Sequence, residues 1–318
     1  MRVVLAAAAP VLRQSIAAIL ETRGHEVLSF AEADRALRQL EADPSANAFI
    51  VAGPESAMAG METCWEARLL ASFERPIYIC MISKPLSSDM MVEALDCGAD
   101  DVLQLPLSAD ELYARLRSAE RLNQMQLKLV EMATRDSLTG MLNRPAFFGR
   151  AVRMCREARA PLAAIMVDID HFKSINDRFG HAAGDTALRA VAQCLDGRSE
   201  LAGRLGGEEF ALLVSQGDPD EAWRVAEMLR SDIAAREINI ETHVLRLSCS
   251  FGIAIGAPGD DIDDLLRRAD AALYTAKRAG RNLVAVYDPE TPAVPNQPDS
   301  IVRCRGGQAA RARRSGAG

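Results

Sequence analysis

The sequence of 318 residues has no long apolar run that would suit a membrane span or a secretory signal. Its N-terminal stretch, MRVVLAAAAPVL, is interrupted at Pro10 and followed by Arg13, so it is too short for either role. The apolar stretches elsewhere have the length of β-strands. We therefore expect a protein without a membrane span that resides in the cytoplasm.

Paired cysteines are also missing. None of the seven cysteines belongs to a C-x-x-C pair, and their number is odd. Scattered single cysteines are typical of reduced, mostly buried thiols in a cytoplasmic protein. They are Cys64, Cys80, Cys97, Cys155, Cys194, Cys249 and Cys304.

A surplus of positive charge is missing as well. The formal net charge is −7, whereas binding to duplex nucleic acid depends on clustered Lys and Arg that displace counterions. The charge therefore argues against nucleic acid as the main partner, but it allows a small anionic ligand.

The length suits two domains, because single domains cluster near about 100–150 residues. Residues 1–118 alternate short apolar runs with amphipathic segments five times. Five such alternations predict a parallel sheet with helices on both faces, which is a doubly wound, flavodoxin-like α/β domain. Its ligand crevice would lie at the carboxyl ends of the strands.

The last helix of this domain is expected to continue beyond it, because residues 108–134 contain neither Gly nor Pro. In the linker segment 119–134, Leu122, Met125, Leu129 and Met132 recur at 3-4-3 spacing. Such an apolar seam suits a coiled coil of two parallel helices. The alternative is a single linker helix that rests this stripe on a neighbouring domain.

Residues 135–288 predict a second, α+β unit. Helices are expected over 144–158, 172–179, 184–195, 221–236 and 262–280, and strands over 162–169, 201–215 as a hairpin, 244–257 and 283–288. The tail at 289–318 is rich in Pro, Gly, Ala and Arg, so we expect a disordered basic end. Contact of this tail with lipid or RNA is the alternative to a solubilising role.

Four acidic residues lie where two of these strands end. Asp168 and Asp170 end an apolar strand, and Glu208 and Glu209 follow two glycines in the turn of the hairpin. Carboxylates in such places are the hard oxygen ligands that magnesium needs beside phosphates. The alternatives are a plain surface hairpin and solvated strand-end acids or helix caps, which we favour for Asp170 alone.

Four motifs resemble, in order, those of the GGDEF family of diguanylate cyclases. They are RDSLTGMLNR (135–144), DIDHFKSINDRFGHAAGD (168–185), GGEEF (206–210) and ALYTAKRAGRN (272–282). The resemblance implies a palm-like fold shared with polymerases and nucleotide cyclases, and the condensation of two GTP into cyclic di-GMP with release of two pyrophosphates. It also implies a homodimer, because each site would hold one GTP and two sites must face each other.

The resemblance assigns metal and catalytic roles residue by residue. Asp168 and Glu208 would bind Mg²⁺ or Mn²⁺ through their carboxylates and Ile169 through its carbonyl, with two ions per site. Glu209 matches the second acidic position, whose role stays open between a second metal and a proton acceptor. Glu208, Glu209 and Lys173 are the implied catalytic residues.

The other matched residues would bind GTP. Asp185 would accept the adjacent N–H donors of guanine and Asn176 would meet its neighbouring acceptor, a pairing that adenine does not offer. The alternatives are a polar residue inside a helix for Asn176 and a helix N-cap for Asp185. The remaining implied substrate contacts are Phe172, Lys173, Lys277 and Arg281.

The sequence departs from this family just before the GGEEF hairpin. Many members carry an inhibitory Arg-x-x-Asp there, which binds the product. Those positions hold Gly197 and Glu200, with Arg198 one place out of register. We therefore expect micromolar cyclic di-GMP to inhibit only weakly.

Residues 1–118 resemble response-regulator receivers, in phrases such as GADDVLQLPLSADELYARLR (98–117), but the phosphorylation residues are replaced. Ala7 and Ala8 stand for the acidic pair, Ala52 for the phosphoacceptor and Leu105 for the lysine, while Ser83 remains at the switch hydroxyl position. Without the acids no magnesium could be held, so activation by phosphorylation is excluded. The expected role is dimerisation or docking of a protein partner.

An active cyclase is the leading hypothesis, and a non-catalytic GTP or cyclic di-GMP sensor or scaffold is the alternative. Degenerate family members usually lose acids of the turn or the strand, and here Asp168, Glu208 and Glu209 are all present. An adenine-containing product is disfavoured by Asp185. A phosphodiesterase activity has no support, because nothing after residue 288 is expected to fold into a further domain.

Overall fold

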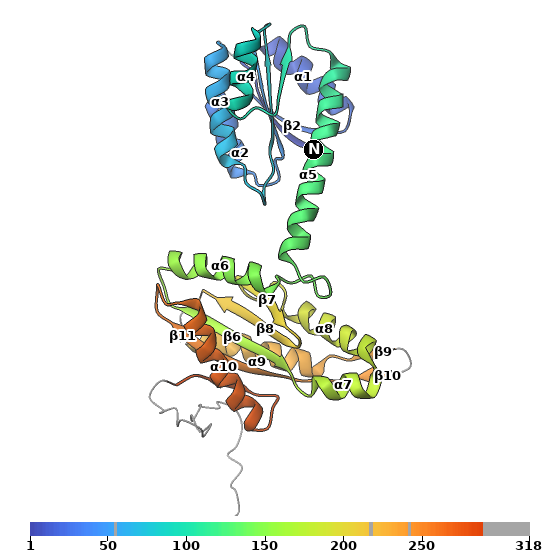
Figure 1. Ribbon diagram of the computed structural model, residues 1–318, viewed down its shortest axis with the longest axis vertical. Helices are drawn as coiled ribbons and strands as arrows, with labels where there is room; N and C mark the ends of the chain where they lie inside the picture. Colours follow the sequence, from blue (N-terminus) through green and yellow to red (C-terminus); the bar gives the residue numbers. More distant parts are fainter. Residues whose placement is uncertain (54–55, 216–218, 241–242, 289–318) are drawn as a thin grey trace, which may run out of the picture. The chain divides into compact units, whose positions relative to one another are not determined.

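The computed structural model describes residues 1–53, 56–215, 219–240 and 243–288 (Figure 1). The chain divides into two compact units, Met1–Glu131 and Met132–Gly318. The basic tail at 289–318, which includes Cys304, lies outside the described residues. Among the helices described, none combines the length and the hydropathy needed to cross a bilayer. The six cysteines in the described ranges are free thiols, and four of them are buried.

The N-terminal unit contains a parallel five-stranded sheet in the order β2-β1-β3-β4-β5. Helical crossovers connect its strands, as parallel pairing requires. The strands are β1 (Arg2–Ala6), β2 (Glu26–Phe30), β3 (Ala48–Ala52), β4 (Tyr78–Ser83) and β5 (Asp101–Gln104). The helices are α1 (Pro10–Thr22), α2 (Ala33–Ala42), α3 (Ala57–Leu70), α4 (Ser88–Asp96) and α5 (Ala109–Thr134).

Helices cover both faces of this sheet. Neighbouring residues of a strand point to opposite faces, so each strand contributes side chains to two cores. Val4 and Phe49 pack in one core with residues of α2, α3 and α4. Leu5 and Ile50 pack in the other with residues of α1 and α5. The parallel sheet with two helical layers agrees with the doubly wound architecture predicted from the alternating pattern (Figure 1).

Helix α5 is a single helix of 26 residues, which confirms that the last helix runs on without interruption. Its first half is anchored in the sheet through the buried Leu112 and Leu116. The predicted seam of Leu122, Met125, Leu129 and Met132 is between 59% and 78% exposed. Its pairing with a second helix stays a prediction.

The C-terminal unit contains a five-stranded sheet in the order β12-β11-β6-β8-β7, in which only β11 and β12 pair in parallel. The strands are β6 (Leu162–Ile169), β7 (Leu201–Gly206), β8 (Glu209–Val214), β11 (Cys249–Gly256) and β12 (Val284–Val286), with β9 (Ile238–Ile240) and β10 (His243–Leu245) as a separate hairpin. The helices are α6 (Arg144–Glu157), α7 (Phe172–Phe179), α8 (His181–Leu195), α9 (Pro219–Ala235) and α10 (Ile262–Arg278).

Two helical layers also cover the sheet of the C-terminal unit. Residues of α7, α8 and α9 form one core with Val167 and Phe210. Residues of α6 and α10 form the other core with Met166 and Leu213. Because β6 lies between β8 and β11, it is buried along its whole length and delivers the acids at its end to the middle of one sheet edge.

Two predicted elements differ from the structure. The single strand expected over 244–257 is wrong, because its first part pairs with β9 in the small hairpin and its second part pairs with β6. The chain passes from the small hairpin to the five-stranded sheet between Leu245 and Cys249, so the predicted strand is divided into β10 and β11. Helix α8 begins at His181, three residues before the predicted start.

Candidate active site

Asp168 lies near the end of β6, where the central strand leaves the core. Strand pairing places it opposite Glu209 of β8 on one side and Ser250 of β11 on the other. Asp168 is only 6% exposed, although a buried carboxylate loses hydration. The register of the two strands, rather than their closeness in sequence, therefore brings Asp168 and Glu209 together.

Glu208 reaches the same edge through the hairpin turn between β7 and β8. Gly207 adopts a left-handed conformation (φ +50°), which glycine accepts without steric cost. The Ile169 N–H donates to the Glu208 carbonyl at 3.4 Å, so the turn is attached to the end of β6. Asp168, Ile169, Glu208 and Glu209 thus come from two segments about 40 residues apart and meet at one edge.

An arginine that the motif comparison did not single out braces this turn. The Arg204 guanidinium donates twice to the Gly207 carbonyl, at 3.0 and 2.7 Å, and forms an ion pair with Asp136 at 2.9 Å. Asp136 also accepts hydrogen bonds from the Thr139 N–H and hydroxyl. Burial raises the pKa of Asp136, but the contacts with Thr139 and Arg204 together outweigh it and hold this pKa below its usual value. The RDSLTG segment therefore supports the GGEEF turn.

Asp168 has an unusual electrostatic environment. Burial raises its pKa to about 6, the Lys277 ammonium opposes this rise, and the negative charges of Glu208 and Glu209 add to it. The Lys277 Nζ lies 2.7 Å from Asp168 Oδ2. Helix α10 therefore supplies a cation that partly offsets the effect of burial on the Asp168 carboxylate.

The donor set fits a divalent metal. Two neighbouring carboxylates and one backbone carbonyl are hard oxygen donors, and Lys277 already provides a positive charge at one of them. Within the described ranges no group of three or more acidic, His or Cys side chains is arranged to hold a metal. Two carboxylates and one carbonyl would fill three positions around Mg²⁺, which prefers six oxygen ligands, so the others would be open to phosphate oxygens and water.

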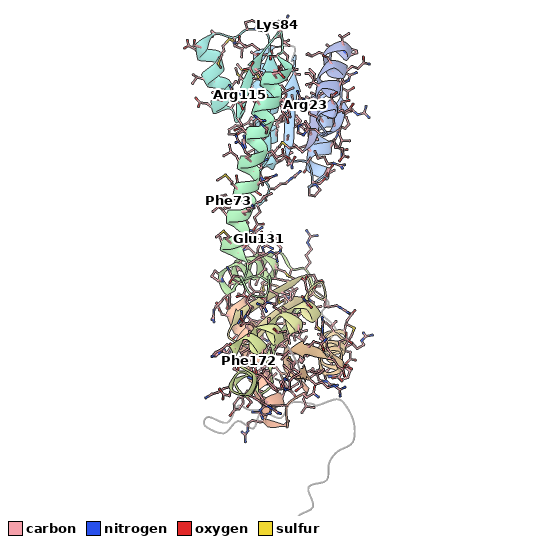
Figure 2. The ribbon with its side chains drawn as sticks, turned by 90° about the vertical axis from the view of Figure 1, so that its right-hand side faces the viewer. Arg23, Phe73, Lys84, Arg115, Glu131 and Phe172 are labelled. Atoms are coloured by element: carbon pink, nitrogen blue, oxygen red, sulfur yellow. The ribbon has the colours of Figure 1, made fainter. Side chains whose placement is uncertain are left out.

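The two residues expected to bind guanine lie on adjacent helices. Asn176 is on α7, and Asp185 is in the first turns of α8. Gly184 makes this approach possible, because a Cβ atom on it would lie 1.9 Å from Asn176 Oδ1 and 3.2 Å from Phe172 Cζ. Phe172, labelled in Figure 2, begins α7. The structure thus brings Phe172, Asn176 and Asp185 into one neighbourhood.

Asp185 is not a helix N-cap, so that alternative is wrong. Helix α8 begins at His181 and its N-cap is Gly180. Asp185 is half-buried inside the helix. Its carboxylate is therefore not required to cap α8.

The three cations expected to contact phosphates occupy different places. Lys277 pairs with Asp168, whereas Lys173 lies exposed in the first turn of α7. Arg281 lies exposed just beyond the end of α10, in a left-handed conformation (φ +63°). Of the three, only Lys277 makes a direct contact with the acidic cluster.

Asp170 is a functional candidate that the sequence interpretation undervalued. We favoured a solvated strand-end acid or helix cap, but Asp170 is 5% exposed and the N-cap residue of α7 is His171. Its carboxylate accepts hydrogen bonds from the hydroxyls of Ser248 and Ser250 and from the Asn282 N–H. Only the three-dimensional structure could show these donors, since they lie 78 to 112 residues away.

The residues at and beside the positions of the inhibitory motif make other interactions. Glu200 accepts hydrogen bonds from the N–H and hydroxyl of Ser215. The Arg198 guanidinium lies 3.8 Å from Asp232 and contacts Met228 Sδ. Gly197 has no side chain to contribute.

The corresponding edge of the N-terminal sheet is built differently. Ala7 and Ala52 are buried, and Ser83 donates its hydroxyl to the Lys84 carbonyl. The Arg13 guanidinium donates to the carbonyls of Ala7 and Ala8 at 2.6 and 3.2 Å. A positive charge thus lies where the receiver resemblance would place an acidic pair.

Comparison with known proteins identifies relatives of this chain. Residues 133–283 match the family described as diguanylate cyclase, GGDEF domain. The chain is 33% identical over 226 residues to the response regulator PleD of Caulobacter vibrioides, covering 66% of this chain and 50% of PleD. It is 37% identical over 183 residues to the diguanylate cyclase VdcA of Vibrio cholerae, covering 55% of this chain and 53% of VdcA.

One solved structure shows a similar fold. The coiled coil and GGDEF domain of DgcB from Caulobacter crescentus, in complex with c-di-GMP, aligns with a TM-score of 0.52 and 32% identity. The alignment covers 56% of this chain and 97% of that chain. The chain spans about half the length of the curated relatives it matches.

Proposed function

Because the chain belongs to the GGDEF family of diguanylate cyclases, we propose that residues 135–288 condense two GTP molecules into cyclic di-GMP and release two pyrophosphates. One observation carries this proposal. Asp168, Glu208 and Glu209 converge on one sheet edge, and the ammonium of Lys277 lies 2.7 Å from the Asp168 carboxylate. Like charges around a buried carboxylate disfavour folding, whereas they favour the binding of a metal ion beside a triphosphate.

Asp168, Glu208 and the Ile169 carbonyl would hold Mg²⁺ or Mn²⁺, two ions per site in all, and Glu209 would serve as a second metal ligand or as the proton acceptor. When bound, the metal lowers the pKa of the attacking 3′-hydroxyl and offsets charge on the α-phosphate. Lys277 would then move from Asp168 to the phosphates, because an ammonium and a metal ion compete for the same carboxylate oxygen.

The nucleotide would be oriented from both ends. Asn176 and Asp185 would read guanine, next to the ring of Phe172, because Gly184 lets their helices come close. Lys173 and Arg281 are exposed cations that would contact the phosphates. Two such sites, each with one GTP, would face each other in a homodimer, because each nucleotide must attack the other.

We assign residues 1–118 to a degenerate receiver-like domain. Its strand order, 2-1-3-4-5, is that of flavodoxin-like doubly wound sheets, and the similarity to a response regulator supports this assignment. Residues 119–134 would form the helical linker and pair in the dimer, and residues 289–318 would be a basic tail. The domain would serve dimerisation or a protein partner in the cytoplasm, without phosphorylation.

The direct test is to incubate the purified full chain with GTP and Mg²⁺ and to follow cyclic di-GMP by chromatography. Glu208→Gln is the matched control, because it keeps the shape of the side chain and removes its charge. Product that vanishes in the variant supports the cyclase. A dimeric wild type that binds GTP but forms no product would instead favour a sensor.

Product inhibition provides a second test. Since Gly197 and Glu200 replace the inhibitory Arg and Asp, we expect cyclic di-GMP in the micromolar range to slow the enzyme only slightly. Initial rates at increasing product concentration measure this. Strong non-competitive inhibition that is lost in Arg198→Ala would contradict the expectation.

A further inference from the structure

The segment that follows α10 has a backbone conformation that needs external support. Arg281 and Asn282 are consecutive residues in the left-handed region, with φ of +63° and +48°. A side chain at Cβ makes this region unfavourable, and a pair of such residues persists only where the surroundings fix it. These two residues follow Gly280 and precede β12.

Two anchors hold Asn282 in this conformation. Its backbone N–H donates to Asp170 Oδ2 at 2.9 Å, and its side-chain Oδ1 accepts from Arg230 Nη1 at 2.8 Å. Arg230 is itself held by Glu227 of the same helix through two hydrogen bonds, at 2.9 and 2.5 Å. The turn is therefore fixed by Asp170, just beyond β6, on one side and by Arg230 of α9 on the other.

Asp170 is suited to this task because its carboxylate is fully engaged. It accepts from Ser248 at 2.7 Å, from Ser250 at 2.6 Å and from Asn282 at 2.9 Å. A carboxylate can accept all three bonds, whereas an alanine would leave the Asn282 N–H and both hydroxyls without this acceptor. The Asp170 N–H is also paired, with the Ser248 carbonyl at 2.9 Å, so the backbone has little freedom.

Arg281 lies between two contacts with the end of β6. On one side, Lys277 reaches Asp168; on the other, Asn282 reaches Asp170. Among the described residues, Arg281 has no ion-pair partner, and its side chain is exposed. A fixed backbone with an unpaired guanidinium, close to the acidic cluster, is a suitable arrangement for holding an anion.

We propose that Asp170 is a positioning residue for nucleotide binding. Through its bond to the Asn282 N–H it fixes the left-handed turn and so places Arg281 at the triphosphate end of the site. Asp170 acts through Arg281 and does not touch the nucleotide or the metal. This inference rests on the proposed function, because it presumes that the site binds GTP.

A double-mutant cycle tests the proposal in the full chain. Asp170→Ala, which removes the acceptor of the Asn282 N–H, is compared with Arg281→Ala and the double variant for the KM of GTP and for kcat in Mg²⁺. Binding of a non-hydrolysable GTP analogue is measured by calorimetry on the same proteins. We expect each single substitution to raise KM about tenfold, the usual scale for losing one charge-assisted phosphate contact, and the double variant to show no further rise.

Arg278→Ala is the matched control, because it removes the same charge three residues earlier and should leave KM unchanged. Thermal melting shows whether each variant is folded. Should Asp170→Ala fail to fold, Asn282→Ala loosens the turn from the α9 side and leaves the buried carboxylate in place. That variant should reproduce the rise in KM and should also be non-additive with Arg281→Ala.

Two results would overturn the proposal: an unchanged KM in the folded Asp170→Ala variant, or effects of Asp170 and Arg281 that simply add. Asn282→Ala with an unchanged KM would do the same where Asp170→Ala does not fold. The proposed cyclase activity stands or falls separately, on product formation by the wild type. If no product forms, binding of the GTP analogue still reports whether Asp170 and Arg281 are coupled.

Discussion

In both units the central strands end at one edge of the sheet. The side chains at these two edges differ in polarity. In the N-terminal unit the edge carries Ala7 and Ala52, which are 2% and 1% exposed. In the C-terminal unit Asp168 lies near the end of β6 and Asp170 just beyond it, and these two residues are 6% and 5% exposed. One edge is therefore apolar, and the other holds carboxylates in a place where their hydration is lost.

This difference shows that the C-terminal edge lowers the stability of the folded unit by burying carboxylates. A buried carboxylate is unfavourable unless a cation or several hydrogen-bond donors compensate it. Asp170 receives three donors and is structurally satisfied. Burial and two neighbouring acids raise the pKa of Asp168, and among the described residues Lys277 is its one ion-pair partner. Asp168 is thus the residue whose retention is explained by ligand binding rather than by stability.

The largest effect on the rate should come from Asp168 at the C-terminal edge, and a substitution at the N-terminal edge provides the comparison. Asp168→Asn should lower the rate of cyclic di-GMP formation about a thousandfold or more, because it removes a charged oxygen from the metal site. Ser83→Ala, which removes the hydroxyl at the N-terminal edge, should leave the rate unchanged. Initial rates of product formation measure both. An equal loss in Ser83→Ala would mean that the N-terminal edge also takes part in the reaction.

The next effect concerns two helical glycines of the C-terminal unit. Gly184→Ala would place a Cβ atom 1.9 Å from Asn176 Oδ1, so the guanine-reading residues must move apart. We expect the KM for GTP to rise about a hundredfold, the scale expected when substrate-binding groups are displaced by about 1 Å. In contrast, a Cβ atom on Gly149 of α6 meets nothing within 4 Å.

Gly149→Ala is therefore the control for this experiment. It should leave KM unchanged and raise the free energy of unfolding by up to about 1 kcal/mol, because alanine favours helix more than glycine does. Steady-state kinetics and thermal melting of both variants give the answer. A Gly184→Ala variant with normal KM would show that α7 and α8 do not read the base together.

Asp168→Asn should also stabilise the metal-free C-terminal unit, although it inactivates the enzyme. The pKa of Asp168 rises from 3.8 to about 6 on folding, so its ionisation opposes folding. The penalty is absent below about pH 4, grows as the pH rises through this window, and is complete above about pH 6. The melting temperature of the variant should therefore exceed that of the wild type by a few degrees at pH 7 and match it at pH 4.

Magnesium sharpens this prediction. A ligand that binds only the folded state raises the melting temperature, so Mg²⁺ with a GTP analogue should stabilise the wild type and have much less effect on Asp168→Asn. Scanning calorimetry at the two pH values, with and without Mg²⁺, distinguishes the cases. A variant that is less stable than the wild type at pH 7 would show that the Lys277 pair outweighs the cost of burial.

Local patterns predicted much of this molecule. The strand that ends in Asp168, the hairpin with Glu208 in its turn and the long α5 follow from apolar runs and from glycine placement. The helix predicted over 172–179, which contains Asn176, agrees with α7, whereas the role of Asn176 was implied by the family resemblance. Each of these features depends on residues that are close in sequence, so composition and periodicity contain the information.

The features that could not be predicted depend on distant partners. Asp170 looked like a solvated acid because Ser250 and Asn282 are 80 and 112 residues away. The break between β10 and β11 arises because the chain changes sheets, which an apolar run does not reveal. Arg204 was overlooked because its partner Asp136 lies 68 residues earlier. Fixed distances between such groups come only from the packed structure.

The smallest effect is expected at the apolar edge itself, when a phosphoryl donor is supplied. Ala52 has no carboxylate to accept a phosphoryl group, and the Arg13 guanidinium bonded to the carbonyls of Ala7 and Ala8 disfavours a metal ion there. Acetyl phosphate with Mg²⁺ should therefore change the rate of cyclic di-GMP formation by less than about twofold, well below the effect of a new phosphate that orders a segment. Acetate at the same concentration is the control, and mass spectrometry shows whether phosphate is incorporated. A tenfold change that follows phosphate incorporation into residues 1–131 would reveal another acceptor. The contrast between an N-terminal edge without chemistry and a catalytic C-terminal edge would then no longer hold.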